Sequence, residues 1–235
     1  MNDSTSAFAT AVQLIGDFDA ALLEIIALSL RVSLSAVVLG ALLGLPLGAA
    51  LAIGRFRGRQ ALIVCVNTLM GLPPVVVGLI VYLQLSQSGL LGWLHILYSP
   101  AAMIIAQLIL VTPIVIALTR QFIEDADADY DEELRSLGVR GWSKLVTLIV
   151  EVRYSLVTVV LAAFGRAIAE VGAVIIVGGN INHVTRVMTT AITLETSKGN
   201  LGLALALGLV LMFLALGVNA AAATIRHFAP KVAYA

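Results

Sequence analysis

Two side chains of opposite charge lie four residues apart inside an apolar stretch of this 235-residue chain. Residues four apart share one face of an α-helix, so Arg166 and Glu170 are placed to form an ion pair. Charges within a hydrocarbon layer are costly unless they pair or face water. Two interpretations follow: a neutralised pair that fixes two helices together, or a pair lining a path in which Arg166 attracts an anion and Glu170 modulates that attraction.

Hydroxyl side chains alternate with apolar ones a little further along the chain, beside Arg186. A helix over this segment has one hydroxyl-rich face and one apolar face, which is typical of a short element lying along a membrane surface. The hydroxyls and Arg186 are then available to receive an anion, and a plain interfacial helix is the other interpretation. The hydroxyls belong to Thr185, Thr189, Thr190, Thr193 and Thr196.

A charged segment between residues 120 and 151 carries the pattern of a bent helical elbow. Gly138 can take the left-handed conformation that ends a helix, and Gly141 precedes a second apolar run. We therefore expect two short helices, 130–137 and 142–150. An exposed elbow of this kind suits a groove on a soluble partner, and a solvated loop is the alternative. The apolar side chains it offers are Leu137, Val139 and Trp142.

The composition identifies the environment of these residues. Hydrophobic residues make up 60% of the chain, charged residues only 12%, and the mean hydropathy is +1.03. Soluble domains carry about a quarter charged residues, so we expect an integral membrane protein. Fourteen basic residues balance fourteen acidic ones, which argues against nucleic acid as a partner. One cysteine and three separated histidines leave no metal-ligand spacing, so no metal site is predicted.

Uncharged runs locate the membrane spans, because about 20 helical residues cross a hydrocarbon layer of about 30 Å. A break rich in Gly, Ser and aromatic residues at 86–100 divides the longest run into two spans, and the charged segment 120–151 is predicted to be a cytoplasmic loop. A tail at 1–22, a transmembrane domain at 23–227 and a tail at 228–235 complete the expected organisation. The five predicted spans are 24–54, 61–85, 101–119, 152–177 and 201–225.

Proline and glycine mark special positions within these spans. The pair 73–74 lies inside the second span, where it is expected to bend the helix. Gly40, Gly44 and Gly48 are spaced four apart in the first span and predict a stripe against which another helix packs closely.

The distribution of Lys and Arg predicts the orientation. Short loops rich in these residues stay in the cytoplasm. Nine of them fall on the side that holds the 120–151 loop, and two, Arg186 and Lys198, fall on the other. We therefore expect the N-terminus outside and the C-terminus in the cytoplasm.

The elbow also resembles a known motif. Glu132, followed six residues later by Gly138 and then by an apolar run ending near Val150, is similar to the cytoplasmic coupling motif of ABC importer permeases. Glu133 and Leu134 stand where that motif has two alanines, and Glu151 stands at its proline position.

Longer segments strengthen the resemblance. FGRAIAEVGAVIIVGGNI at 164–181 and TRVMTTAITLETSKGN at 185–200 resemble the permease subunit of tungstate-type ABC transporters, as do 29–36, 55–59 and 67–79. Molybdate and sulfate permeases share the general plan, but the Val-Gly-Gly-Asn and Thr-Arg-Val-Met-Thr-Thr runs are closer to the tungstate group.

The resemblance implies an all-α, five-helix type I ABC importer permease of a bacterial or archaeal cell (inner) membrane, with a coupling-helix elbow. It also implies a second copy of the chain, a cytoplasmic ATPase dimer and an extracytoplasmic oxyanion-binding protein. The chain has no G-x-x-x-x-G-K-[ST] run, so it is not expected to be an enzyme or to hold a cofactor, and ATP and magnesium belong to the partner ATPase. The implied coupling residues are Glu132, Glu133, Leu134, Leu137, Gly138, Val139 and Trp142.

The expected function is import of tungstate or a similar tetrahedral oxyanion. Import of molybdate or sulfate is the alternative within the same family. Two other classes stay open: an ion-coupled secondary transporter that uses Arg166 and Glu170 as a relay, and a membrane scaffold without transport activity.

Overall fold

The computed structural model describes residues 2–228, which are almost entirely helical and contain no strand. The predicted all-α class is confirmed. Of the expected tail 228–235, only Phe228 lies within the described residues. The helices are α1 (Asn2–Gly16), α2 (Ala20–Ile53), α3 (Arg59–Met70), α4 (Pro74–Leu85), the 3-10 helix η1 (Gly92–Leu94), α5 (Pro100–Ser136), α6 (Trp142–Glu151), α7 (Arg153–Ile168), α8 (Gly172–Gly178), α9 (Met188–Ser197) and α10 (Leu201–Phe228).

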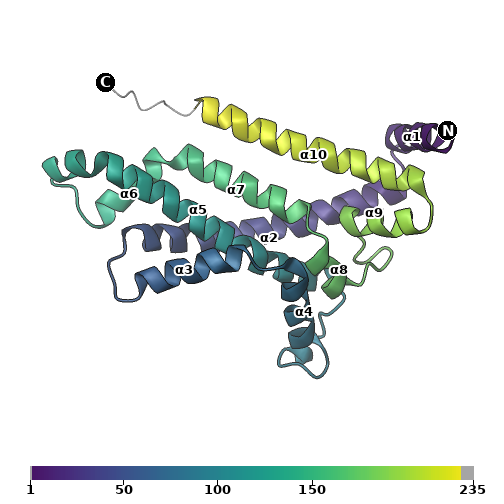
Figure 1. Cartoon of the computed structure of the whole chain (residues 1–235), viewed down its shortest axis with the longest axis horizontal. Helices are drawn as coiled ribbons and strands as arrows, with labels where there is room; N and C mark the ends of the chain where they lie inside the picture. Colours follow the sequence, from purple (N-terminus) through teal and green to yellow (C-terminus); the bar gives the residue numbers. More distant parts are fainter. Residues whose placement is uncertain (1, 229–235) are drawn as a thin grey trace.

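Three long helices, α2, α5 and α10, follow the long axis of the molecule (Figure 1). Each is long and apolar enough to cross a membrane, and two bent pairs, α3 with α4 and α6 with α7, bring the number of candidate spans to as many as five. The bends measure 98° and 68°. The chain is therefore a multi-pass membrane protein, and five, the predicted number of spans, is the upper count. The fourth candidate, α6 with α7, covers 142–168 and not the predicted 152–177.

The glycine stripe of α2 is a packing face, as its spacing predicts. A Cβ at Gly44 would lie 2.7 Å from the Cβ of Val115 on α5, and a Cβ at Gly48 would lie 2.7 Å from the Ile116 carbonyl oxygen. Larger side chains at these positions would push the two helices apart. The stripe thus allows α2 and α5 to pack along much of their length.

The second predicted span is two helices instead of one. Pro73 has an extended backbone conformation and Pro74 is the first residue of α4. A proline lacks the N–H that a continuing helix needs and fits best at a helix start. The expected helix over 61–85 therefore ends at Met70, and α4 begins at 98° to it.

The helix that contains the third predicted span, α5, is longer than expected. The expected span ends at residue 119, but α5 continues without interruption to Ser136. The charged residues after position 119 indicate where the membrane ends, but charge by itself does not terminate a helix. No proline or glycine follows Pro113 before the elbow, and ion pairs such as Asp131 with Arg135, 2.8 Å apart, support the extension. The segment 120–136 is thus helix and not loop, and the short helix expected at 130–137 is the last part of α5.

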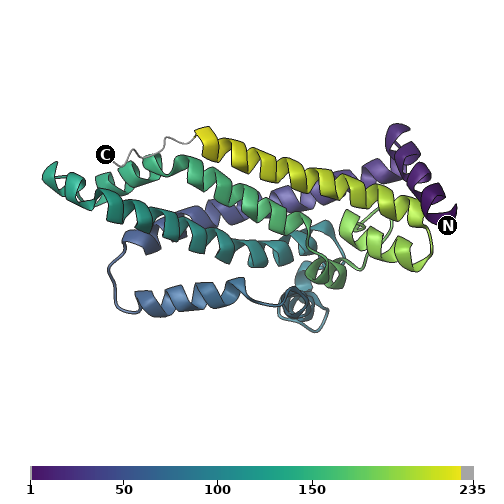
Figure 2. The same cartoon turned by 45° about the horizontal axis from the view of Figure 1, so that its top comes forward.

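The fourth predicted span, 152–177, is also interrupted. Helix α7 ends at Ile168 and α8 begins at Gly172, so Glu170 lies in the break between them. The expected tail at 1–22 contains a helix, α1, which packs against α10, as Figure 2 shows at the end of the bundle opposite the elbow.

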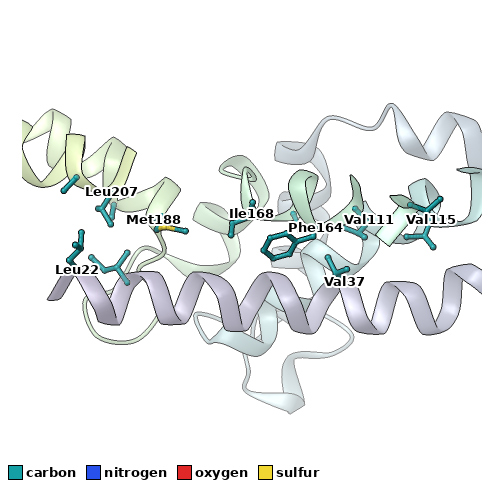
Figure 3. Packing of buried hydrophobic residues seen from close by; sticks show 14 of the residues in the cluster. Leu22, Val37, Val111, Val115, Phe164, Ile168, Met188 and Leu207 are labelled. Atoms are coloured by element: carbon teal, nitrogen blue, oxygen red, sulfur yellow. The ribbon is translucent and has the colours of Figure 1, made fainter. Parts of the chain in front are cut away.

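Apolar side chains from six helices, α1, α2, α5, α7, α9 and α10, form the largest core cluster. Leu22, Val111, Phe164, Met188 and Leu207 come from α2, α5, α7, α9 and α10 and face one another along the bundle (Figure 3). A second cluster joins α4, α5 and α8, and a third lies beneath the elbow. These clusters hold the elbow and the α7–α8 break in fixed positions relative to α5.

Candidate functional site: coupling elbow and polar junction

The elbow, residues 132–142, turns at the left-handed glycine that the sequence predicts. Gly138 has φ +72°, and the N–H of Val139 donates to the carbonyl oxygen of Leu134 at 2.9 Å. Gly141 also has a positive φ, and α6 begins directly after it. Glycine adopts this backbone conformation without the steric cost that a Cβ brings. The expected second helix, 142–150, is confirmed as α6.

One side of the elbow is buried and the other is exposed. Leu134 and two leucines of α6, Leu145 and Leu148, pack in the cluster beneath it. The side chains of Leu137 and Trp142 are 75% and 76% exposed, and Glu132 and Glu133 are exposed beside them. Val139 is half-buried and packs against the buried cluster. The elbow is therefore a supported projection with two large apolar side chains at its tip.

Polar contacts fix α6 to the end of α5. The ammonium of Lys144 lies 2.5 Å from Asp127 Oδ1 and 2.8 Å from Asp131 Oδ1. The hydroxyl of Tyr130 donates to Glu151 Oε1 at 3.2 Å. Because these contacts connect the two helices on either side of the turn, they hold the elbow against the end of α5.

The base of the elbow is tied to the neighbouring helices through Arg59. Its Nε donates to the Leu51 carbonyl oxygen at 2.9 Å, and its guanidinium pairs with Glu124, which also pairs with Arg120. The end of α2, the start of α3 and the middle of α5 thus meet at one side chain. From the sequence, Arg59 is expected only to be a cytoplasmic cation. Its partner Glu124 lies 65 residues away, so no local pattern predicts the contact.

A second group of polar residues surrounds the break between α7 and α8. We call it the polar junction, and its members are Gln107, Arg166, Ala167, Glu170 and Thr189. Arg166 Nη1 lies 2.5 Å from Glu170 Oε2, so the predicted ion pair is confirmed. Glu170 is 4% exposed and also accepts a hydrogen bond from the N–H of Ala173 at 3.2 Å. The pair joins the end of α7 to the start of α8 instead of lying on one continuous helix.

Side chains from two other helices donate hydrogen bonds to backbone carbonyls at the break. Gln107 Nε2 on α5 donates to the Ala167 oxygen at 3.0 Å, and Thr189 Oγ1 on α9 donates to the Glu170 oxygen at 2.8 Å. Free carbonyls at membrane depth cost several kcal/mol unless they find such partners. The polar junction therefore stabilises a helix break that four helices share.

The expected hydroxyl-rich outer face is only partly present. Helix α9 forms as predicted, and Thr193 and Thr196 are exposed, but Thr185, Thr189 and Thr190 are buried. Thr185 Oγ1 donates to the Gly178 oxygen at 2.5 Å, and Thr190 Oγ1 donates to Asn180 Oδ1 at 2.9 Å. The surface placement expected for these three threonines is therefore wrong, because each hydroxyl satisfies a polar group inside the protein. Arg186 is half-buried and donates to Asn182 Oδ1 at 2.9 Å.

A buried carboxylate that the sequence does not single out closes the turn from α9 to α10. Glu195 is 5% exposed and accepts hydrogen bonds from Lys198 Nζ at 3.0 Å and from Asn200 Nδ2 at 2.9 Å. The hydrogen bond from Lys198 is the largest influence that holds the pKa of Glu195 below its ordinary value. An acidic residue three positions before a lysine is the one local signal for this contact.

The fold and the elbow together define a multi-pass membrane subunit that presents one supported contact surface beyond its spanning helices. The sequence profile of the family described as the inner membrane component of binding-protein-dependent transport systems matches residues 44–233. The chain belongs to this family of type I ABC importer permeases.

Its relatives include permeases named for anion transport. A probable anion ABC transporter permease of Haloferax volcanii is 43% identical over 89% of this chain and 92% of its own. Tungstate uptake permeases of Peptoclostridium acidaminophilum and Campylobacter jejuni are 39% and 41% identical, over 91% and 70% of this chain and 93% and 69% of their own. A putative molybdenum permease of Bacillus subtilis and a sulfate permease of Synechococcus elongatus are 29% and 30% identical.

Proposed function

We propose that this permease subunit imports tungstate or a similar tetrahedral oxyanion and is driven by ATP hydrolysis in a separate subunit. The observation that carries the proposal is the elbow, whose tip exposes Leu137 and Trp142 above a buried and ion-paired base. A fixed apolar projection of this kind fits a groove on a soluble partner. In this proposal the partner is a cytoplasmic ATPase dimer that binds ATP and magnesium.

Helix α5 provides the mechanical link between ATP hydrolysis and the transport path. It runs unbroken from Gln107 at the polar junction to Leu134 at the elbow, a distance of about 40 Å at roughly 1.5 Å per residue. A displacement of the elbow therefore reaches the α7–α8 break through one rigid element. Nucleotide drives the change only if the ATPase grips one arrangement of the elbow more tightly than the other.

In this proposal the polar junction lines the transport path and controls the passage of the anion. Arg166 is 39% exposed while its partner Glu170 is buried, so the guanidinium has a free side that can attract a divalent oxyanion. Glu170 limits that attraction, which lets the anion leave again. Thr185, Thr189 and Thr190 act by holding the backbone around the path, and Arg186 provides a second cation near the outer end.

The positions of the cations support a cytoplasmic elbow. The loop between α2 and α3 lies at the same end of the bundle as the elbow, while α9 lies at the opposite end, near α1 (Figure 1). Arg55 and Arg57 belong to that loop and Arg59 begins α3, whereas Arg186 and Lys198 flank α9. Cation-rich short loops remain in the cytoplasm. We therefore place the N-terminus outside, where a binding protein delivers the oxyanion to a pore formed with a second copy of the chain.

The assignment to tungstate follows the order of similarity, because relatives named for tungstate are closer in sequence than those named for molybdenum or sulfate. The test is the tungsten content of cells that lack the gene, compared with cells complemented by it, in medium with limiting tungstate. We expect a loss of tungsten uptake that vanadate reproduces and a protonophore does not. Uptake that follows the proton gradient would indicate a secondary transporter, and a selective loss of molybdenum or sulfate would change the substrate.

A further inference from the structure

A groove of about 560 Å³ lies beside the base of the elbow. The end of α2, the 54–58 loop and the corner between α5 and α6 form its walls. These segments meet at the same end of the bundle, at the left of Figures 1 and 2. The side chains relevant here are those of Arg55, Phe56, Arg59, Asp127 and Lys144.

The ion pairs around the groove leave an excess of positive charge. Arg59 and Arg120 share one carboxylate, Glu124, and the other two carboxylates of the network, Asp127 and Asp131, are bound by Lys144 and Arg135. Arg55 forms no ion pair with any residue that the structure describes. Among the charged side chains that line the groove, three cations, Arg55, Arg59 and Lys144, stand against one carboxylate, Asp127, so the groove attracts anions.

Several N–H groups of these cations remain free to bind a ligand. Arg59 uses Nε and Nη2 for protein contacts, and its Nη1 donates to no described residue. Lys144 uses two of its three donors, on Asp127 and Asp131. The guanidinium of Arg55 is unused among the described residues. Arginine donors in this number suit the oxygen atoms of a phosphate group, which guanidinium binds in a bidentate manner.

The groove is also amphipathic, which points to a lipid instead of a free ion. Phe56 is 51% exposed at the end of a candidate membrane span, at the level where aromatic side chains anchor proteins to the interface. Exposed leucines, Leu47 on α2 and Leu62 on α3, lie one to two helical turns along the chain from the lining residues. They offer apolar surface for acyl chains beside a headgroup held in the groove.

We propose that the groove binds the phosphate headgroup of an anionic phospholipid, with Arg55 and Arg59 donating to the phosphate oxygens. Lys144 adds positive charge, and Phe56 packs against the glycerol and upper acyl region. Basic pockets at the cytoplasmic ends of membrane helices are suited to such headgroups. The inference concerns a site apart from the transport path and does not depend on which oxyanion is carried.

The test is a lipid titration of the purified full chain in detergent, followed by native mass spectrometry. Phosphatidylglycerol and phosphatidylcholine are compared on the natural chain, on Arg55→Gln and on Arg57→Gln. Arg57 is the matched control because it is an exposed cation of the same loop that does not line the groove. We expect phosphatidylglycerol to bind more tightly than phosphatidylcholine. Arg55→Gln should weaken the anionic lipid about fivefold, the effect of one cation near a membrane surface, and Arg57→Gln less than about twofold.

Three outcomes would overturn the proposal. Equal affinity for the two lipids would remove the headgroup charge from recognition. Equal losses in Arg55→Gln and Arg57→Gln would indicate diffuse surface attraction instead of a site. Displacement of phosphatidylglycerol by equimolar glycerol 3-phosphate would assign the groove to free phosphate esters, because the acyl chains would then add nothing to binding.

Discussion

Gln107 on α5 donates a hydrogen bond to the carbonyl oxygen of Ala167, 3.0 Å away at the end of α7. The two residues lie 60 positions apart in the sequence. The same carbonyl oxygen also accepts from the Glu170 N–H at 3.2 Å, so Gln107 adds a second hydrogen bond at the α7–α8 break. Because α5 also carries the elbow, this contact connects the coupling surface to the helix break. The polar junction therefore responds to movement of α5.

Replacing Gln107 by Leu should destabilise the protein and impair uptake. The substitution removes one of the two hydrogen bonds that the Ala167 carbonyl accepts, a contribution of about 0.5–1.5 kcal/mol. Thermal unfolding of the purified chain and uptake in cells measure the two effects. Gln121→Leu is the control, because Gln121 is an exposed residue of the same helix. Equal losses in both variants would mean that the contact with Ala167 has no particular importance.

Replacing Gly138 by Val should uncouple ATP hydrolysis from transport. Gly138 has φ +72°, where a β-branched side chain costs at least ~1–2 kcal/mol, equivalent to roughly 5–30-fold in an equilibrium. Uptake per ATP hydrolysed by the reconstituted complex is the measurement. Gly138→Asn is the control, since asparagine tolerates the left-handed region better than valine. Unchanged coupling in the valine variant would remove the turn from the mechanism.

Replacing Trp142 by Ala should weaken assembly with the ATPase without unfolding the chain. Trp142 is 76% exposed, so truncation leaves no cavity, whereas a tryptophan at the centre of an interface often contributes about 2 kcal/mol or more. Co-purification of the two subunits measures the loss, expected to be about 30-fold in affinity. Val150→Ala, at an exposed position near the other end of α6, should assemble normally. Full assembly of the Trp142 variant would exclude the elbow tip as the contact.

The sequence reveals what depends on local spacing and composition. Uncharged runs locate the spans, Gly138 predicts the turn, and the four-residue spacing predicts the Arg166–Glu170 pair. Contacts between distant segments leave no such pattern, so the Gln107 and Arg59 contacts emerge only from the fold. Charge also fails to predict where a helix ends. The acidic segment after residue 119 indicates contact with water, yet α5 continues through it. Likewise, the spacing of Thr185, Thr189 and Thr190 cannot reveal that their hydroxyls turn inward to satisfy polar groups.

Reversing the charge of Arg166 should abolish uptake while assembly with the ATPase persists. Arg166→Glu places a second carboxylate beside buried Glu170, so two like charges meet where an ion pair stood. The exchange Arg166→Glu with Glu170→Arg separates the two interpretations of this pair. A structural pair predicts that the exchange restores both stability and uptake, since opposite charges again face each other. A path-lining pair, as proposed here, predicts recovered stability without uptake, because the cation then lies at the wrong position.

The contact between Glu195 and Lys198, at the turn from α9 to α10, should make the stability of the folded chain depend on pH in the acid range. The pKa of Glu195 in the folded protein lies below the ordinary value of 4.5, chiefly because Lys198 donates to the carboxylate. A depressed pKa gives stability that is fully present above 4.5 and is lost as pH falls below it, since the unfolded chain then binds the proton first. Thermal unfolding of Glu195→Gln should therefore occur at a lower temperature than that of the natural chain at pH 7, and the difference should shrink below pH 4.5. Asp17→Asn is the control, because it removes an exposed carboxylate that has no ion pair with a described residue, and it should lower the unfolding temperature at pH 7 less than Glu195→Gln does. A gap between Glu195→Gln and the natural chain that persists undiminished in acid would show that the carboxylate charge does not carry the stabilisation.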